Sequence, residues 1–356
     1  MRLLLVSSAC LLALCLAGGQ ALHAQAAPSP DAPPSSSAPP PADEDQDGPV
    51  TTLKVQTSLV SLYFTVKDKR GGLVPTMTQQ DCTVFENKEP QKLRSFAAEA
   101  NQPLTLGILL DTSGSQTNVL QMEQQTGGAF LKRILRQKDE AFLISFDVDV
   151  NLLQDYTSNA SRLARAMEKA EINTAGGNGS AGIPGIGQGP VPTQGAPKGT
   201  LLYDAVYLAS GDKLRTETGR KALILLTDGE DEGSRYKIQQ AIEAAQKANA
   251  IIYVLLIADR GVYAGSMMGY TGASAMRKLT EETGGRMIDV GNNGRKMEDA
   301  FAQIEAELRT QYVATYTPAN QNMDGSYRPI AVQCKGDGLK VQVRKGYYAL
   351  PSDGSQ

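Results

Sequence analysis

Apolar runs of strand length alternate with segments of helical periodicity through the middle of the chain. The apolar runs are almost free of charge and are bounded by Pro, Gly or polar turns, and they cover residues 104–110, 141–146, 221–227 and 251–257. Such runs are typical of strands buried on both faces of a parallel sheet. The intervening segments favour helices at 116–136, 158–170, 202–214, 237–248, 274–283 and 295–310. With a short strand at 286–290 and an antiparallel edge at 152–156, the pattern predicts about six strands and six helices.

Both flanks of this region have a β pattern instead. Residues 59–66 and 82–86 are strand-like on the N-terminal side, and residues 312–316, 327–334 and 339–344 are strand-like on the C-terminal side. About three strands alone make a poor core, so we expect the two flanks to fold together as one small β-sandwich. Two separate hairpins attached to the central sheet are the alternative. The predicted domains are a flanking β domain at 51–100 and 313–350 and an α/β domain at 101–312 with a Gly/Pro-rich insertion at 175–199.

The N-terminal segment has the pattern of a cleaved secretory signal peptide. Residues 1–26 combine Arg2, an apolar run and small residues that end in Ala24-Gln-Ala26. An uncleaved membrane anchor and lipid attachment at Cys15 are the alternatives. Residues 27–50 are rich in Pro, Ala and Ser and favour a disordered linker. These patterns predict a secreted, periplasmic or cell-envelope protein with no transmembrane segment after cleavage.

Signal cleavage would remove a residue that several classes of enzyme and metal site require. It removes His23, the only His of the chain, and the sequence has no Trp. Without His, Ser-His-Asp and Cys-His hydrolysis and His-ligated zinc or iron sites are excluded. Cleavage also removes one of 35 basic residues and none of the 38 acidic ones, which leaves a net charge of −4. No basic arm stands out, so nucleic acid is not an expected partner.

Two cysteines would remain in the mature chain, one in each flank. Cys82 has the strand parity of Val84, and Cys334 has that of Val332, so both should face an apolar interior. In an oxidising compartment, an intramolecular disulfide between Cys82 and Cys334 would tie the flanks together. Two buried thiols that never meet are the alternative.

Oxygen-bearing side chains follow the apolar run 104–110 directly. Asp111, Ser113 and Ser115 are spaced at i, i+2 and i+4, on a turn that Gly114 should make sterically easy. Carboxylates and hydroxyls are the ligands that suit Mg2+, Mn2+ or Ca2+. Three ligands do not complete an octahedron, and open α/β sheets place their sites at strand ends. Asp228, after the run 221–227, and Thr200, at the start of a predicted helix, are the candidate partners.

The order of these residues along the chain resembles the metal-ion-dependent adhesion site (MIDAS) of von Willebrand factor type A (VWA) domains. The matching positions are Asp111-x-Ser113-x-Ser115, then Thr200, then Asp228. The resemblance covers roughly residues 103–312, and the flanking segments 91–96, 324–330 and 344–348 resemble secreted acidobacterial proteins that contain such a domain. It implies a Rossmann-like fold with helices on both faces of a mostly parallel sheet.

The resemblance also implies a non-enzymatic, adhesion-type module. Ser113 and Ser115 would bind the cation directly, and Asp111 and Asp228 would bind it directly or through water. Thr200 would join or leave the coordination shell. A carboxylate from a protein partner would then complete the octahedron.

Two other functions stay open from the sequence. One is a structural scaffold of the envelope with a vestigial metal site. The other is a Mg2+-dependent phosphatase, because Asp147-Val-Asp149 follows a buried run and partly resembles the nucleophile loop of haloacid-dehalogenase-like enzymes, although Asn151 stands where that loop has Thr or Val. The acidic segment 230–232 either increases cation affinity or forms the first turn of a helix that begins near Ser234.

Overall fold

The structure is a computed structural model that describes residues 59–98, 102–173, 199–258 and 271–350. The predicted signal peptide at 1–26, the linker at 27–50 and nearly all of the insertion at 175–199 lie outside these residues. The chain divides into two compact units, Met1–Lys54 and Val55–Gln356, and every described residue belongs to the second. No helix within the described ranges is long and apolar enough to cross a membrane.

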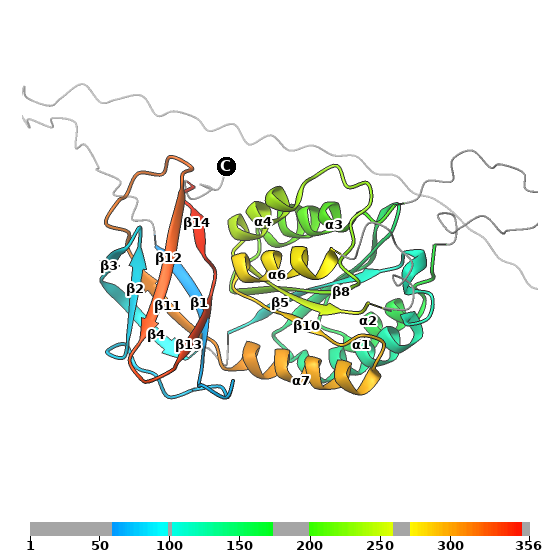
Figure 1. Cartoon of the computed structure of the whole chain (residues 1–356), viewed down its shortest axis with the longest axis horizontal. Helices are drawn as coiled ribbons and strands as arrows, with labels where there is room; N and C mark the ends of the chain where they lie inside the picture. The colour runs from blue at the N-terminus through cyan, green and yellow to red at the C-terminus, as the bar shows by residue number, and fades with distance from the viewer. Residues whose placement is uncertain (1–58, 99–101, 174–198, 259–270, 351–356) are drawn as a thin grey trace, which may run out of the picture. The chain divides into compact units, whose positions relative to one another are not determined.

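A six-stranded sheet forms the centre of the α/β region (Figure 1). The strand order is β10-β9-β8-β5-β6-β7, and all neighbours are parallel except β6 and β7. Every residue of β5, β8 and β9 is buried, as the uncharged runs predict. The strands are β5(Leu104–Asp111), β6(Glu140–Phe146), β7(Val150–Thr157), β8(Arg220–Thr227), β9(Ala250–Leu256) and β10(Met287–Asp289).

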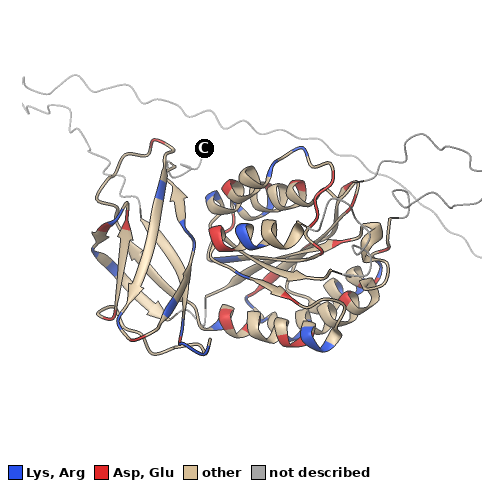
Figure 2. Ribbon diagram, in the orientation of Figure 1, with Lys and Arg blue, Asp and Glu red and all other residues tan. Residues whose placement is uncertain are grey.

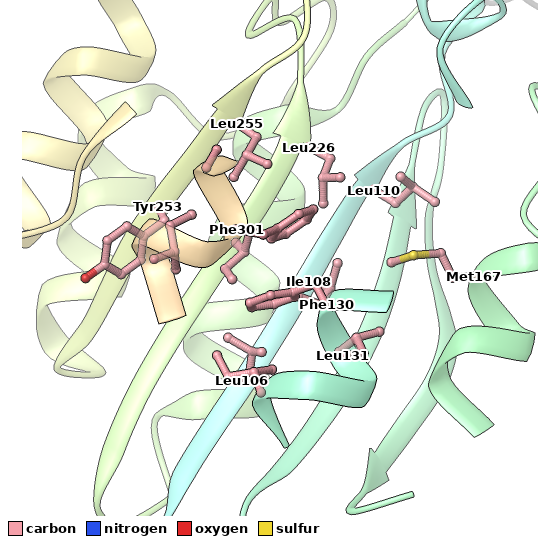
Figure 3. Close-up of a cluster of buried hydrophobic side chains, with 14 of the residues drawn as sticks. Leu106, Ile108, Leu110, Phe130, Leu131, Met167, Leu226, Tyr253, Leu255 and Phe301 are labelled. Carbon is pink, nitrogen blue, oxygen red and sulfur yellow. The ribbon is translucent and has the colours of Figure 1, made fainter. Parts of the chain in front are cut away.

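Helices cover both faces of this sheet. On one face lie α1(Leu120–Ile134), α2(Ala160–Glu168) and α7(Gly294–Arg309), and on the other lie α3(Leu202–Leu208), α4(Ile238–Lys247) and α6(Gly272–Thr283) (Figure 1). Successive side chains of β5 point into opposite cores: Ile108 and Leu110 face the first, and Leu109 faces the second. Figure 3 shows the first core, in which the stacked rings of Phe130 and Phe301 lie 4.3 Å apart. In Figure 2 the central strands are mostly tan, the colour of residues other than Lys, Arg, Asp and Glu. On the visible helices, Lys and Arg are interspersed with Asp and Glu.

The flanks form two four-stranded antiparallel sheets with the orders β13-β1-β11-β4 and β14-β12-β2-β3. Each sheet contains strands from both ends of the chain, and the two sheets share one hydrophobic core. The fold class is therefore confirmed, and separate hairpins on the central sheet are not formed. The strands are β1(Val60–Lys67), β2(Cys82–Glu86), β3(Glu89–Gln91), β4(Leu93–Ala98), β11(Tyr312–Tyr316), β12(Tyr327–Cys334), β13(Lys340–Val343) and β14(Gly346–Tyr348).

The predicted disulfide is present in this region. Cys82 and Cys334 are directly opposite each other in the register of β2 and β12, and their sulfur atoms are bonded. The parity argument from the sequence is thus confirmed. The domain boundaries at residues 101 and 312 stay predictions.

Some helix boundaries differ from the sequence-based expectation. After β5 the chain forms a short 3-10 turn, η1(Gly114–Gln116), and α1 begins only at Leu120. The predicted helix 202–214 is α-helical to Leu208 and then continues as a π-helical turn, η3(Ala209–Leu214). No helix begins near Ser234, because α4 begins at Ile238.

Candidate metal centre

The parallel pairing of β5 and β8 brings two of the predicted carboxylates to one edge of the sheet. Leu110 is opposite Leu226 in the register, so Asp111 lies level with Thr227 and Asp228 comes one residue further on. Both are almost fully buried, with exposed fractions of 0% and 2%. The Thr227 hydroxyl donates a hydrogen bond of 2.6 Å to Asp111 Oδ2, which fastens one strand end to the other.

The turn after β5 adds the two serines to this edge. The Ser113 backbone N–H donates to Asp111 Oδ1 at 3.0 Å, and the hydroxyl oxygens of Ser113 and Ser115 lie 3.0 Å apart. The Gln116 side-chain amide donates to Asp228 Oδ2 at 3.0 Å and to Ser115 Oγ at 3.4 Å. One hydrogen-bonded network therefore contains four of the five predicted ligands. Gln116 and Thr227 belong to it and were not predicted.

Glycine is needed in one of the two turns at this edge, but not in the one we expected. Gly114 is not among the residues with a positive φ, and a Cβ there would meet no atom within 4 Å. Gly229, directly after Asp228, has φ +82, and a Cβ there would lie 3.0 Å from the backbone oxygen of Gly272. The close approach of these two backbones shapes the loop that presents Asp228.

Thr200 lies on a neighbouring loop and is placed by its backbone. Its N–H donates to the Glu232 carbonyl at 2.8 Å, and the Glu232 N–H donates back at 3.0 Å. The N–H of Leu201 donates to the Asp147 carbonyl at 2.8 Å. Thr200 is thereby held between the loop after β8 and the turn between β6 and β7, while its side chain is not part of the four-residue network.

The network brings carboxyl groups of like charge together in a buried environment. Burial, followed by the charge of Asp228, raises the pKa of Asp111 to about 7. Glu123, in the first turn of α1, is fully buried beside them, and burial together with the charges of Asp111 and Asp228 raises its pKa well above the ordinary value. Such an accumulation of buried carboxylates is found most often at functional sites.

The donor set fits a hard divalent cation. Carboxylate and hydroxyl oxygens are the groups that Mg2+, Mn2+ and Ca2+ prefer. Three buried oxygens, Gln116 Oε1 and both carboxylate oxygens of Glu123, have no hydrogen-bond partner among the described residues. This is costly unless water, such as the water bound to a cation, supplies a donor. No three His, Cys, Asp or Glu side chains of the described ranges are grouped to hold a metal ion by themselves, so hydroxyls would have to complete the shell.

Asp147, the candidate phosphatase nucleophile, has a different environment. It lies on the hairpin turn between β6 and β7, and its Oδ2 accepts a hydrogen bond of 2.7 Å from the Thr112 hydroxyl. Its Oδ1 accepts from the Asn173 side-chain amide at 2.9 Å and from the Asp149 N–H at 3.2 Å. Both oxygens are thus engaged in holding the turn, an arrangement that favours a structural role.

The acidic segment 230–232 does not form the first turn of a helix. Glu230 Oε1 instead accepts hydrogen bonds from the backbone N–H groups of Thr271 and Gly272, at 2.7 and 2.8 Å. Glu230 therefore caps the N-terminus of α6, where a negative charge is favourable. Asp231 accepts from the Tyr203 N–H at 3.1 Å and so ties the same loop to α3.

No protein-family model and no curated protein matches the sequence. Similar solved structures include the conserved hypothetical protein BatB from Bacteroides thetaiotaomicron, at 16% identity over 58% of this chain and 99% of that chain, with a TM-score of 0.42. An aerotolerance-related membrane protein from Bacteroides fragilis is similar at 17% identity over 57% of this chain and 99% of that chain, with a TM-score of 0.40.

Proximal thread matrix protein 1 from the mussel byssus, in a structure with a zinc-occupied MIDAS motif, is similar at 15% identity over 63% of this chain, with a TM-score of 0.43. This chain spans about half of that structure, 49% of its length. At these identities and TM-scores, the likenesses assign neither a family nor a function to this chain.

Proposed function

We propose that this chain is a non-enzymatic, adhesion-type protein-binding module that captures a carboxylate of a partner protein through a divalent cation. The cation would be Mg2+, or Mn2+ or Ca2+ in its place. Its ligands would be Asp111, Ser113, Ser115, Thr200 and Asp228. The observation that supports this most is the network at the ends of β5 and β8, which gathers two buried carboxylates and two hydroxyls on one edge of the sheet.

The chemistry of the ligands explains why a partner would be needed. Two carboxylates match the charge of a divalent cation, and the hydroxyls of Ser113, Ser115 and Thr200 add oxygens without adding charge. A cation held in this way stays electrophilic, and Mg2+ demands an octahedral set of oxygens. A carboxylate from another protein supplies the missing oxygen, and its attraction to the cation is strong where water is partly excluded.

The remaining sequence features fit a module that works outside the cytoplasm. We propose that residues 1–26 direct export, that residues 27–50 are a linker, and that the β domain at 51–100 and 313–350 supports the α/β domain at 101–312. The Cys82–Cys334 disulfide agrees with an oxidising compartment such as the periplasm or the cell exterior.

Calorimetric titration of Mg2+ and Mn2+ into purified, EDTA-stripped protein tests the proposal. We expect saturable binding in the wild type and loss of binding in Asp111→Ala and Asp228→Ala, with unchanged far-UV circular dichroism. Asp149→Ala is the matched control, because Asp149 is an exposed acid at the same edge, outside the network. Immobilised wild-type protein should then retain acidic partners in Mg2+ and release them in EDTA.

Absence of binding in the wild type at millimolar Mg2+ and Mn2+ would contradict the proposal. The function would then be that of the alternative, a structural envelope protein with a vestigial site, and partner capture would not depend on metal.

A further inference from the structure

Glu123 is a buried acid that lies outside the five predicted ligands. Its side chain is fully buried near the start of α1, and neither carboxylate oxygen has a hydrogen-bond partner among the described residues. Positions at this depth in a helix are ordinarily apolar, as Leu120 and Phe130 are in the same helix. The partial positive charge of the helix N-terminus favours a carboxylate there but offers only part of what water would supply. The described residues therefore leave this carboxyl group without a compensating partner.

Gln116, which belongs to the network, shows a similar deficit. Its amide nitrogen donates to Asp228 and Ser115, while its carbonyl oxygen is buried without a donor. Together Gln116 and Glu123 present three acceptor oxygens that lack donors. Two acids that interact electrostatically with Glu123, Asp111 and Asp228, are themselves predicted cation ligands. A hydrated divalent cation brings both missing elements, positive charge and water protons, because Mg2+ keeps several water molecules when it binds to proteins.

We propose that Glu123 and Gln116 are positioning residues of the cation site, which accept hydrogen bonds from the water of the cation from behind Asp111 and Asp228. This inference rests on the proposed function and extends it to residues outside the five predicted ligands. Glu123 acts from behind the direct ligands, because the three carboxylates are not grouped to hold an ion by themselves. Residues of this kind orient the ligands and tune the affinity of metal sites.

The decisive variant is Glu123→Gln, which keeps the size of the side chain and removes its charge. We expect calorimetry with Mg2+ and electron paramagnetic resonance of free Mn2+ to show cation binding weakened roughly tenfold to a hundredfold. Glu123→Asp keeps the charge and should recover part of the affinity. Glu298→Gln, at an exposed position of α7, is the matched control and should bind as the wild type does.

A second readout separates this role from a structural one. In EDTA, Glu123→Gln should raise the urea midpoint of unfolding, because burying an ionisable carboxyl group without a partner costs more free energy than burying a neutral amide of the same size. In Mg2+, the same variant should gain less stability than the wild type gains, because it binds the cation more weakly. A side chain that only fills space predicts no such reversal. Gln116→Met, which removes the amide, should also weaken cation binding and provides a second test if Glu123→Gln does not fold.

The outcomes distinguish this inference from the proposed function. If the wild type binds Mg2+ and Glu123→Gln and Gln116→Met bind it within about twofold of the wild type, the inference is overturned and the proposed function stands. If the wild type does not bind the cation, both are overturned. Weaker binding in Glu123→Gln with partial recovery in Glu123→Asp supports the inference.

Discussion

Two buried glutamates of this molecule have opposite surroundings. Glu86, in the β-sandwich, accepts a hydrogen bond of 3.3 Å from the Arg328 guanidinium and bonds of 2.7 and 3.0 Å from the hydroxyls of Tyr316 and Tyr347. Glu123, in the α/β region, has no hydrogen-bond partner among the described residues and faces the charges of other carboxylates. The first charge is neutralised within the chain and serves stability. The second has no counter-charge among the described residues, and a buried acid with a raised pKa is a candidate for a functional role.

The largest expected effect that tests this comparison is a loss of stability in the β-sandwich. Arg328, with an exposed fraction of 1%, forms an ion pair with Glu86. In Arg328→Met, Glu86 would stay buried without its counter-charge, and we expect the free energy of unfolding to fall by about 3–5 kcal/mol. Urea unfolding of wild type and variant at neutral pH measures this difference.

The double variant Glu86→Gln/Arg328→Met is the control for that experiment. It removes both charges and should recover a large part of the lost stability, because no uncompensated charge remains. Glu89→Gln, at an exposed position of β3, should change the free energy of unfolding by less than about 0.5 kcal/mol. A cost below about 1 kcal/mol in Arg328→Met would show that Glu86 does not depend on its partner, and the contrast with Glu123 would lose its meaning.

The next effect concerns the disulfide of the sandwich. Cys82 and Cys334 join β2 to β12, so their double replacement by Ala should lower the free energy of unfolding by about 2–4 kcal/mol. Cation affinity should stay the same, because neither cysteine belongs to the network of Asp111 and Asp228. Urea unfolding and Mg2+ calorimetry on the same samples test both statements. A tenfold change in Mg2+ affinity would show that the two regions are coupled and cannot be compared as independent.

The sequence predicted the fold well where buried strands have an unambiguous pattern. The charge-free runs at β5 and β9 indicated strands covered on both faces, and the parity of Cys82 and Cys334 predicted that both face an apolar interior, which made their pairing plausible. The strands β3, β4 and β14 were missed. The strands β3 and β14 have only three residues each, and no residue of β4 is fully buried, so none of them shows a clear apolar pattern. Polar residues directly after buried strands located Asp111 and Asp228 correctly at one sheet edge.

The sequence could not reveal the residues behind that edge. An acid near the start of a helix is ordinarily exposed and stabilised by the helix dipole, so the sequence contains no sign that Glu123 is buried. Only the packing of α1 against the sheet shows that it is buried beside Asp111. Gln116 and Thr227 were hidden for the same reason, because side-chain hydrogen bonds between distant segments leave no trace in local periodicity.

The smallest effect we predict is the response of the metal-free site to pH. Burial, and then the charge of Asp228, raises the pKa of Asp111 from its ordinary value to about 7. Between about pH 4 and pH 7 the folded state therefore holds a proton that the unfolded state has lost, so in EDTA the free energy of unfolding should fall as the pH rises through this window. One pKa unit corresponds to about 1.4 kcal/mol, so the fall should lie between about 1 kcal/mol and the upper limit of about 4 kcal/mol that a rise of the pKa by about three units sets.

Asp228→Asn removes the second cause and should make the dependence shallower, although burial remains. Saturating Mg2+ should reverse the dependence, because the cation binds the ionised carboxylates. If Asp228→Asn leaves the wild-type slope unchanged, the titration belongs to another group. The contrast between the buried charge of this site and that of Glu86 would then lose its support.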